Sequence, residues 1–370
     1  MNAFEGSLPK EAEIVIVGGG FAGAATAYYL ALFGTKGVVL LEAAEQFGAH
    51  SSGKNAGMAR QVTDDPITTR VLKESVTAIK SMGKGFLDER GSLLLCGKGA
   101  KILTVVRMYP SLSKVLQKGE AVHMVNLLDA CDFELAIFTS SDGTVDISSL
   151  LWHYLKGAKQ KGVMLFRHVK VIEVLTQSGT VSGVVTNIGR IRCKIVVNAG
   201  GAFANEVAKM ASLKEIPLIP YKRHLFATPP LPFVVDSWPF VWDVTHGFYF
   251  KPECKGLLLS ACDETPTTPD DERTDPHALE LLAQKMKDHC PPLFNIPISK
   301  YWAGLRTFAS DRRFVVGFDP LLHGFFWVAG LGGHGVTASA KVAEVAARML
   351  LGLSVESEIA KALSPARFRT

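Results

Sequence analysis

The sequence predicts an α/β domain joined to an α+β domain that is built on a mixed sheet. Three observations lead to this fold class. The apolar run EIVIV (13–17) leads into a glycine-rich turn and helical spacing, and a second apolar run, GVVLLE (37–42), follows. Farther along, short aromatic and β-branched runs alternate with turn residues, as strands of a mixed sheet do. A chain of 370 residues is also too long for one simple core.

The composition indicates a well-buried globular protein. Apolar residues make up 48% of the chain and charged residues 20%. The net charge of +5 is small and its basic residues are scattered, which argues against a nucleic-acid partner and favours small anionic molecules at most. There is no apolar run of about 18 residues and no secretory signal, so we expect a cytoplasmic protein without a transmembrane segment. Six separated cysteines without a CxxC motif favour reduced, buried thiols and no metal site.

The amino-terminal segment carries a dinucleotide-binding pattern. Gly18, Gly20 and Gly23 form GxGxxG, a helix is expected up to Gly34, and the second strand ends in Glu42. The first glycine makes the turn, the second lets the backbone approach a pyrophosphate, and the third lets helix and strand pack closely. The helix amino terminus offers N–H groups to the phosphates, and Glu42 would bind the adenosine ribose. An unrelated glycine-rich turn is the alternative, which the acid at the expected place disfavours. The glycines alone do not separate NAD from FAD.

Three further segments resemble one family of flavin enzymes. The loop EQFGAHSSGKNAG (45–57), the turn VVNAGGAFA (196–204) and the segment GFFWVAGLGGHGVTASAKVAEVAARML (324–350) are similar to the flavin contacts of the FAD-dependent D-amino-acid oxidase and glycine oxidase (DAO) family. Within it, YKRHLFATPP, GFYFKPE and WAGLRTF most resemble the D-arginine dehydrogenase-like amino acid dehydrogenases.

The resemblance implies a fold and its domain boundaries. It implies a Rossmann-like FAD-binding domain of the glutathione-reductase type and a second, mixed β-sheet substrate domain. The FAD-binding domain is expected to be discontinuous, over 1–85, 145–215 and 300–370, and the substrate domain to cover 86–144 and 216–299.

The resemblance also implies the cofactor contacts. FAD is expected to be non-covalent, with His50 unattached, because no cysteine falls in LRTFASDRR (305–313), where the family's sarcosine oxidases attach their flavin. The positions that match cofactor contacts are Gly18, Gly20, Phe21, Ala22, Gly23, Glu42, Ala43, His50, Ser51, Ser52, Lys54, Asn55, Ala56, Gly57, Val169, Val171, Ala199, Gly200, Gly201, Gly304, Arg306, Gly330, Gly332, Gly333, His334, Gly335, Val336 and Thr337.

The carboxyl-terminal glycine-rich turn is expected to start a helix near Gly335. Thr337, Ser339 and the first backbone N–H groups would face the turn, where a helix amino terminus stabilises negative charge on a reduced flavin. His334, at the mouth of this turn, is either a capping or solvent-facing histidine or a lining residue of the substrate site. His50 likewise has two interpretations, a plain loop residue or a residue of the site.

Two arginines and a tyrosine on expected strands are candidates for binding a carboxylate. A guanidinium binds a carboxylate through two hydrogen bonds, and a tyrosine adds one donor. Read alone, Arg223 is more typical of an ion pair and Tyr249 of packing, whereas Gly304 leaves room for a ligand beside Arg306. The resemblance implies that Arg306 binds the substrate carboxylate and that Arg223 and Tyr249 line the same site.

The sequence departs from the arginine-oxidising relatives where their substrate's guanidinium would be held. Met58 and Arg60 follow the flavin loop, and Ser92 stands where an acid is expected. These residues favour a neutral or acidic amino acid, or an N-alkyl or imino acid, over a cationic one.

The expected reaction is FAD-dependent oxidation of an α-amino or N-substituted amino acid, with a D-amino acid or an imino acid as substrate. Hydride would pass from Cα to flavin N5, and water would hydrolyse the imine. The neutral amine needs no obligatory protein base, and His50, Tyr249 or water could accept the ammonium proton. The acceptor could be oxygen or a quinone, and the protein a monomer or a homodimer.

Three alternatives stay open. A FAD-dependent 2-hydroxy acid dehydrogenase would need a base, so substitution of His50 or His334 would abolish its turnover. A flavin subunit of a multi-subunit dehydrogenase would act only with its partners. A NAD-dependent dehydrogenase is the least favoured.

Overall fold

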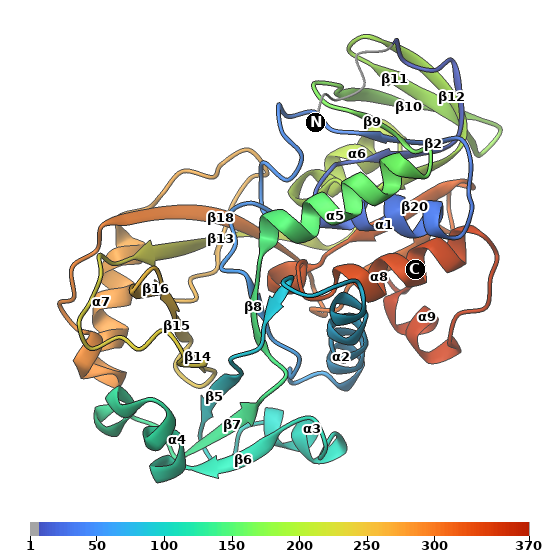
Figure 1. The fold of residues 1–370 in the computed structure, drawn as a ribbon. Coiled ribbons are helices and arrows are strands. Elements are labelled where there is room, and N and C mark those ends of the chain that lie inside the picture. Colours follow the sequence, from blue (N-terminus) through green and yellow to red (C-terminus); the bar gives the residue numbers. More distant parts are fainter. Residues whose placement is uncertain (1–6, 370) are drawn as a thin grey trace. The chain divides into compact units, whose positions relative to one another are not determined.

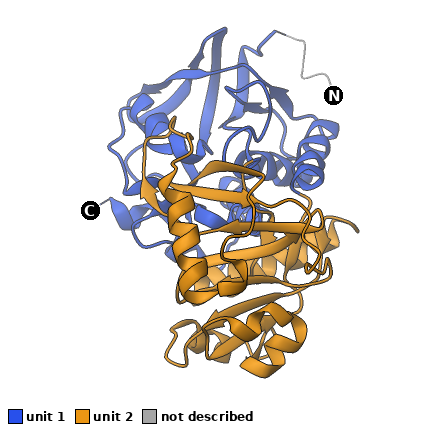
Figure 2. Cartoon of the chain, turned by 90° about the vertical axis from the view of Figure 1, so that its left-hand side faces the viewer, with its two compact units in different colours: residues 1–53, 147–220, 306–370 blue, residues 54–146, 221–305 orange. Residues whose placement is uncertain are grey.

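The computed structural model describes residues 7–369, which form two compact units (Figure 2). Unit 1 contains the described residues up to Gly53, then Ile147–Pro220, and those from Arg306 on; unit 2 contains Lys54–Asp146 and Tyr221–Leu305. The later boundaries fall inside two long strands, β13 (Leu218–Ala227) and β18 (Lys300–Ala309).

The division into units differs most from the expected domains at residues 54–85, which were expected in the FAD-binding domain. Residues 54–85 belong to unit 2. The reason is local pairing: β3 (Met58–Ala59) pairs with β8 (Gly143–Val145), and α2 (Pro66–Ser81) packs on α3 (Ile102–Met108).

Unit 1 is built on an eight-stranded mixed sheet (Figure 1). Its strands are β1 (Glu11–Val17), β2 (Val38–Leu41), β9 (Met164–Phe166), β10 (Val171–Gln177), β11 (Thr180–Thr186), β12 (Gly189–Asn198), β19 (Val315–Phe318) and β20 (Phe325–Ala329). β1 pairs in parallel with β2 on one side and with β12 on the other, and β20 also pairs in parallel with β12. Every residue of β2 and β20 is buried, on both faces of the sheet. This explains why the two strands contain apolar residues without alternating polar ones.

The helices of unit 1 cover this sheet. They are α1 (Phe21–Leu32), α5 (Ile147–Gln160), η2 (Gly201–Phe203), α6 (Ala204–Met210), η4 (Gly332–His334), α8 (Ser339–Leu350), α9 (Ser357–Leu363) and η5 (Pro365–Phe368). α1 packs between α5 and α8, which is why it is rich in buried alanines (Figure 1). It ends before Gly34, whose φ of +84° is the left-handed geometry that commonly closes a helix.

Unit 2 carries most of a nine-stranded sheet and a small three-stranded one. The large sheet contains β5 (Ser92–Cys96), β6 (Lys114–Gln117), β7 (Leu135–Thr139), β14 (Phe240–Asp243), β15 (Phe248–Glu253), β16 (Gly256–Ser260) and β17 (Thr265–Pro266) with β13 and β18, and the small one contains β3, β4 (Leu87–Asp88) and β8. The sheet pairs β14 in parallel with β5 and antiparallel with β15. The expectation of a mixed sheet is confirmed.

The helices of unit 2 are short apart from two. They are α2, α3, α4 (Lys118–Met124), η1 (Asn126–Ala130), α7 (His277–His289) and η3 (Pro291–Leu293). α2 begins at Pro66 because Asp65 caps it, accepting a hydrogen bond from the Thr68 N–H at 2.9 Å.

A two-residue turn joins β15 to β16, as KPECKG predicts. Glu253 pairs with Gly256 across it, and Cys254 and Lys255 have φ values of +50° and +62°. Two positive φ values match the right-handed twist of a hairpin. Cys254 is exposed, whereas Cys96, Cys131, Cys193 and Cys290 are buried, and all six cysteines are free thiols. The expectation of buried cysteines therefore fails at this turn.

The proline- and charge-rich stretch 262–275 is more ordered than its composition predicts. β17 lies within it and pairs with β13, and the buried Asp263 accepts hydrogen bonds from the His224 backbone and ring. Lys222 binds Asp271 at 2.8 Å, and Lys54 forms an ion pair with Glu272. Asp263, Asp271 and Glu272 of this loop thus have partners in unit 2, whereas Asp270 and Arg273 are exposed.

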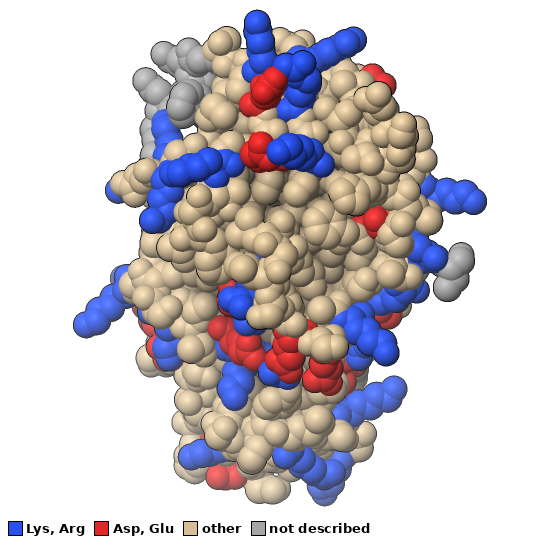
Figure 3. Space-filling view, turned by 90° about the vertical axis from the view of Figure 1, so that its right-hand side faces the viewer, with Lys and Arg blue, Asp and Glu red and all other residues tan. Residues whose placement is uncertain are grey.

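The surface shows mixed charge. On the face drawn in Figure 3, Lys and Arg side chains stand apart among acidic and uncharged residues.

Among residues 7–369, no helix has the length and apolarity needed to cross a membrane.

Candidate functional site

The glycine-rich turn of unit 1 has the geometry that its motif requires. The Gly18 N–H donates to the Leu41 carbonyl at 2.8 Å, so the turn leaves β1 beside the end of β2. A Cβ at Gly23 would lie 1.9 Å from the Gly18 carbonyl oxygen, and one at Gly18 would lie 2.4 Å from the Ala199 oxygen. Only glycine permits this close approach of helix, turn and neighbouring strand.

Glu42 is buried at the end of β2 and faces the same turn. Its Oε2 accepts the Gly19 N–H at 2.7 Å and its Oε1 accepts the Ala44 N–H at 2.8 Å. Each carboxylate oxygen keeps a second lone pair, so both can still accept hydrogen bonds from ribose hydroxyls. The Val169 N–H donates to the Glu42 backbone carbonyl at 2.9 Å, which places Val169 beside the backbone of Glu42.

The loop after β2 contacts the start of α1. Ser52 Oγ accepts the Phe21 N–H at 3.0 Å and so satisfies one of the unpaired donors of the helix amino terminus. His50 is exposed, and its ring meets the edge of Phe203 with centroids 5.8 Å apart.

A second glycine-containing turn follows β12. The Ala199 N–H donates to the Val17 carbonyl at 2.9 Å, so this turn lies next to the first one. The Asn198 side chain donates to the Ala204 carbonyl at 2.7 Å and accepts the Gly200 N–H at 3.2 Å, which fixes the turn into α6. The carboxyl ends of parallel strands β2, β1 and β12 thus lie at one edge of the sheet, where open α/β sheets bind ligands.

The carboxyl-terminal turn differs in detail from the prediction. Gly332 has φ +53° and lies against the Phe308 ring, and α8 begins at Ser339, after the η4 turn, instead of near Gly335. The Ser339 hydroxyl is 3.0 Å from the Tyr154 hydroxyl in the interior, so it does not face the turn as expected. Thr337 is buried and His334 is half-buried.

Arg223 of unit 2 is buried on β13 and has protein partners. Its Nε donates to the Asp263 carbonyl and its Nη2 to Glu264, both at 3.0 Å. Burial works to lower the pKa of Arg223, but nearby groups, including Tyr249 and Glu264, raise it above its ordinary value. Arg223 thus forms the ion pair that is typical of such an arginine. These two contacts leave only part of its guanidinium to bind a ligand.

Aromatic residues and a second arginine group together in unit 2. Trp242 on β14 lies opposite Tyr249 on β15, with ring centroids 4.7 Å apart. The Arg60 guanidinium lies over the Trp242 ring, 4.1 Å from its centroid, in a cation–π contact. Burial lowers the pKa of Arg60, and the charge of Arg223 lowers it further while Cys262 and Asp142 raise it. We call Arg60, Arg223, Trp242 and Tyr249 the cationic–aromatic group.

An acid lies beside the strand position where sequence comparison found none. Ser92 Oγ donates to Asp142 Oδ2 at 2.6 Å, and the Gln61 amide nitrogens donate to Oδ1 at 3.1 and 2.9 Å. Asp142 follows β7 and is fully buried. It places a carboxyl group near Arg60 from a different segment of the chain.

The predicted site residues divide between the two units. Arg306 is buried on the part of β18 that belongs to unit 1. Unit 1 also carries Gly18, Gly20, Phe21, Ala22, Gly23, Glu42, Ala43, His50, Ser51, Ser52, Val169, Val171, Ala199, Gly200, Gly201, Gly330, Gly332, Gly333, His334, Gly335, Val336 and Thr337. Unit 2 carries Lys54, Asn55, Ala56, Gly57, Arg223, Tyr249 and Gly304. The structure brings together Glu42 with the first turn, and Arg223 with Tyr249.

One protein family matches this sequence over almost the whole chain. The family model described as FAD dependent oxidoreductase (DAO) matches residues 13–349. The chain belongs to the FAD dependent oxidoreductase family. The resemblance predicted from the sequence is confirmed, and with it FAD as the cofactor.

Relatives and solved structures agree on this family. Sarcosine oxidase subunit beta of Rhizobium meliloti is 26% identical over 330 residues, which cover 84% of this chain and 77% of that protein. The mouse pyruvate dehydrogenase phosphatase regulatory subunit is 25% identical over 358 residues, 90% of this chain and 40% of that protein. The chain therefore spans about two fifths of that relative's length. L-proline dehydrogenase from P. horikoshii superposes with a TM-score of 0.88 at 25% identity, over 98% of this chain and 99% of that chain. Glycine oxidase from Bacillus cereus ATCC 14579 has a TM-score of 0.79 at 19% identity, over 96% and 99% of the two chains, and supports the fold alone.

The residues of unit 1 fit FAD. The Gly18–Gly23 turn admits no Cβ at Gly18 or Gly23, where a backbone oxygen is too close, and the buried Glu42 keeps acceptor capacity beside it. Gly18, Gly20 and Gly23 would hold the pyrophosphate with the α1 amino terminus, and Glu42 would hold the ribose.

The residues that the sequence did not single out as site residues are Trp242 and Asp142. No motif marks them, since Trp242 is an aromatic residue in a strand and Asp142 an acid in a turn. The clue for Asp142 was indirect: a serine at the expected acid position needs a buried partner, and here the partner is a carboxylate.

Asp142 predicts a pH dependence of stability. Burial raises its pKa from 3.8 to about 7, although hydrogen bonds from Ser92 and Gln61 and the charge of Arg60 lower it. Between about pH 4 and pH 7 the folded chain therefore keeps a proton that the unfolded chain has lost, so this group's contribution to stability falls as the pH rises through that window. The fall is on the order of a few kcal/mol across the window.

We expect Asp142→Asn to remove this slope, because an amide can keep the Gln61 and Ser92 hydrogen bonds without ionising. The measurement is the urea unfolding midpoint of both proteins from acid to neutral pH. Equal slopes for the two proteins would contradict the prediction.

Proposed function

We propose that the protein uses FAD to oxidise the CH–NH bond of an α-amino or N-substituted amino acid, with an imino acid or a D-amino acid as substrate. The observation that carries the proposal is the cationic–aromatic group, which combines two guanidinium groups, a phenol and an indole on unit 2. The names of similar proteins support it: L-proline dehydrogenase and sarcosine oxidase both act on secondary amines.

Arg306 is the proposed anchor of the substrate carboxylate. It is buried on β18, so a carboxylate bound there would be shielded from water, and a guanidinium can bind it through two parallel hydrogen bonds. Tyr249 and the remaining donors of Arg223 would line the substrate site. Such anchoring fixes the direction of the Cα–H bond and can lower the barrier by several kcal/mol.

Arg60 and Arg223 are proposed to set the preference for the substrate side chain. The two guanidinium groups are close enough for the charge of Arg223 to lower the pKa of Arg60. This part of unit 2 therefore already holds two positive charges. A cationic side chain would add a third and be repelled, whereas a neutral or acidic one would not. Trp242 holds the Arg60 guanidinium in place through their cation–π contact.

Bound FAD would supply the redox chemistry by accepting hydride from the substrate Cα. The chain's part is to bind the neutral amine in the reacting orientation and to let its ammonium proton leave to water. His50 is exposed and His334 half-buried, which suits proton exchange with solvent more than a fixed catalytic base. Hydrolysis of the imine needs water alone.

A second candidate is a flavin subunit that works only within an assembly. Two relatives carry such names: sarcosine oxidase subunit beta and the hydrogen cyanide synthase subunit HcnC of Pseudomonas aeruginosa. The 2-hydroxy acid dehydrogenase has no observation of this kind in its favour.

The test is anaerobic mixing of the purified flavoprotein with L-proline, sarcosine, neutral and acidic D-amino acids, D-arginine and lactate. We expect the oxidised flavin absorbance to bleach with at least one secondary or D-amino acid, and at least about tenfold more slowly with D-arginine, since one repulsive contact costs about 1.4 kcal/mol or more. Dithionite, which reduces any accessible flavin, is the control. Bleaching by lactate alone would favour the 2-hydroxy acid reaction. Failure with every amino acid tested, reversed by added partner subunits, would favour the assembly.

A further inference from the structure

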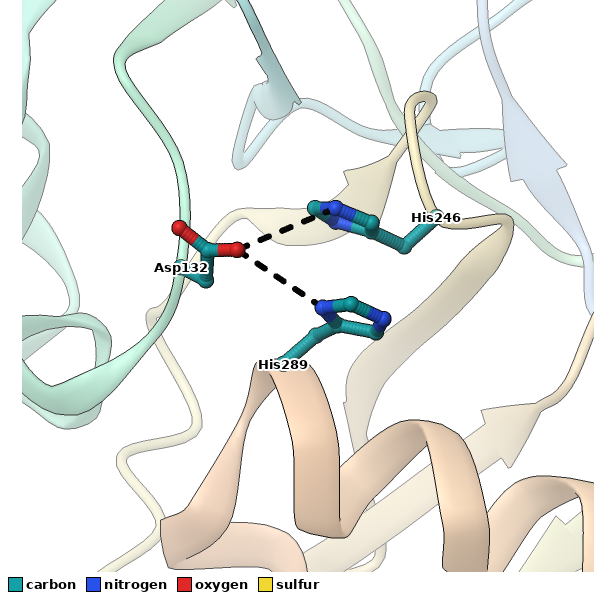
Figure 4. Close-up of side chains that lie close together, drawn as sticks. All are labelled: Asp132, His246 and His289. Carbon is teal, nitrogen blue, oxygen red and sulfur yellow. Dashed lines mark ion pairs between the residues drawn. The ribbon is translucent and has the colours of Figure 1, made fainter.

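Three side chains of unit 2 converge at a place that the proposed reaction does not use (Figure 4). Asp132 lies between η1 and β7, His246 in the turn between β14 and β15, and His289 at the end of α7. Their ligand atoms all lie within 4.8 Å of one another. Asp132 Oδ2 is 3.9 Å from His246 Nε2 and 3.7 Å from His289 Nδ1, and the two imidazole rings are stacked 3.6 Å apart.

A buried carboxylate orients His246. Asp243 is 1% exposed, and its Oδ2 lies 2.9 Å from His246 Nδ1 while Oδ1 accepts the N–H groups of Thr245 and His246. Because an ionised carboxylate can only accept, Nδ1 carries the proton and Nε2 presents a lone pair toward Asp132. A carboxylate behind a histidine is the usual support of a metal ligand.

His289 is held from behind in a different way. The Asp132 N–H donates to the His289 carbonyl at 2.9 Å, so the backbones of these two residues are fixed to each other. His289 Nδ1 is buried and makes no hydrogen bond within the described structure. A buried ring nitrogen without a hydrogen bond is costly, and a cation between it and the Asp132 carboxylate would remove that cost.

We propose that Asp132, His246 and His289 bind a divalent cation of the zinc type. Two imidazoles and one carboxylate suit Zn²⁺ better than Mg²⁺ or Ca²⁺, which prefer oxygen ligands. Tetrahedral bonds to zinc of about 2.0–2.2 Å place ligand atoms about 3.4 Å apart, so the observed separations need to close by only a few tenths of an ångström for the aspartate contacts. Asp132 and His246 also line a surface hollow of about 190 Å³, which leaves room for water in the fourth position.

The neighbouring cysteines do not belong to this site. Cys131 and Cys290 stand next to two of the ligands in the sequence, but both are buried in the unit 2 core.

The cation would join three segments of unit 2 that are distant in the sequence. These are the loop before β7, the β14–β15 turn and the end of α7. Metal bound only by the folded chain stabilises it in proportion to the logarithm of the metal concentration. The expected role is therefore structural.

The experiment uses the tag-free, FAD-loaded chain with Cys254→Ser, because the exposed Cys254 thiol would itself bind zinc. Calorimetric titration with Zn²⁺ should show one site per chain, and Zn²⁺ should raise the unfolding temperature. His246→Ala and His289→Ala should each weaken zinc binding at least tenfold, and Asp243→Asn by about 10–100-fold. Asp132→Asn changes an exposed side chain and tests the site even if a histidine variant folds poorly.

The matched control is His277→Ala, which removes a histidine paired with Asp275 at the start of the same helix. It should leave the zinc affinity unchanged. Absence of saturable zinc binding would overturn the proposal. Equal binding by the folded Asp132→Asn variant and by the His246→Ala, His289→Ala double variant would overturn it too, since zinc would then bind elsewhere.

Discussion

Replacing Arg306 with Met should weaken the binding of carboxylate ligands by about 30-fold or more while FAD stays bound. Removing one partner of a buried, hydrogen-bonded charge pair costs about 2–5 kcal/mol, and each 1.4 kcal/mol is a factor of ten in affinity. Met keeps the length and apolar stem of the side chain, so β18 should form unchanged. The measurement is the change in flavin absorbance on titration with a non-reacting carboxylate such as benzoate, with the flavin-to-protein ratio showing that the cofactor is retained.

The matched control is Arg312→Met, the same chemical change a short distance along the chain. Arg312 is exposed and its guanidinium lies over the Phe308 ring, 4.3 Å from the centroid. This variant should bind benzoate as the unmodified protein does. If Arg306→Met also kept its affinity, the assignment of the carboxylate to Arg306 would be wrong.

Gly23→Ala should abolish stable FAD binding. The new Cβ would lie 1.9 Å from the Gly18 carbonyl oxygen, and because the backbone fixes the Cβ position, no side-chain rotation relieves this contact. The turn or the first turn of α1 must shift, at a cost of about 2 kcal/mol or more, and the N–H groups meant for the pyrophosphate shift with it. We expect the variant to bind FAD at least about 30-fold more weakly, since each 1.4 kcal/mol is a factor of ten in affinity, and to lose flavin on dialysis. The flavin-to-protein absorbance ratio after dialysis measures this.

Gly119→Ala controls for the exchange of glycine for alanine itself. Gly119 lies in α4, and a Cβ there would meet nothing within 4 Å. Alanine should raise the free energy of unfolding by about 0.5–1 kcal/mol, because it loses less backbone entropy in a helix, and leave the flavin content unchanged. Normal flavin content in Gly23→Ala would show that the turn is more adaptable than its geometry indicates.

The parts of this protein that short-range rules govern could be predicted from its sequence. Gly18, Gly23 and Glu42 lie within one strand–turn–helix–strand segment. Their positions can be predicted because their spacing in the sequence fixes how they lie relative to one another. The hairpin at Cys254 and Lys255 and the strands on either side are equally local. The sequence predicts the start of α8 near Gly335, whereas the helix begins at Ser339. The reason is that the same glycine-rich sequence is compatible with the tight η4 turn that precedes the helix.

Contacts between distant segments could not be predicted. Ser92 and Asp142 meet only because β5 pairs with β7, so the missing acid could not be located from either segment alone. Asp132, His246 and His289 come from three separate segments, and their spacing in the sequence is not that of a metal-binding motif. The loop 262–275 has the composition of exposed chain, and only its partners Lys54, Lys222 and His224 show that it is held.

The exposed thiol at the β15–β16 turn makes the protein easy to label and sensitive to handling. Cys254 projects from a tight hairpin, whereas Cys262 is half-buried and the other four thiols lie inside the protein. A maleimide dye or spin probe should therefore attach at this turn first, giving a reporter of unit 2. In air, without a reducing agent, the same sulfur would link two molecules into a covalent pair, which could be mistaken for a native dimer.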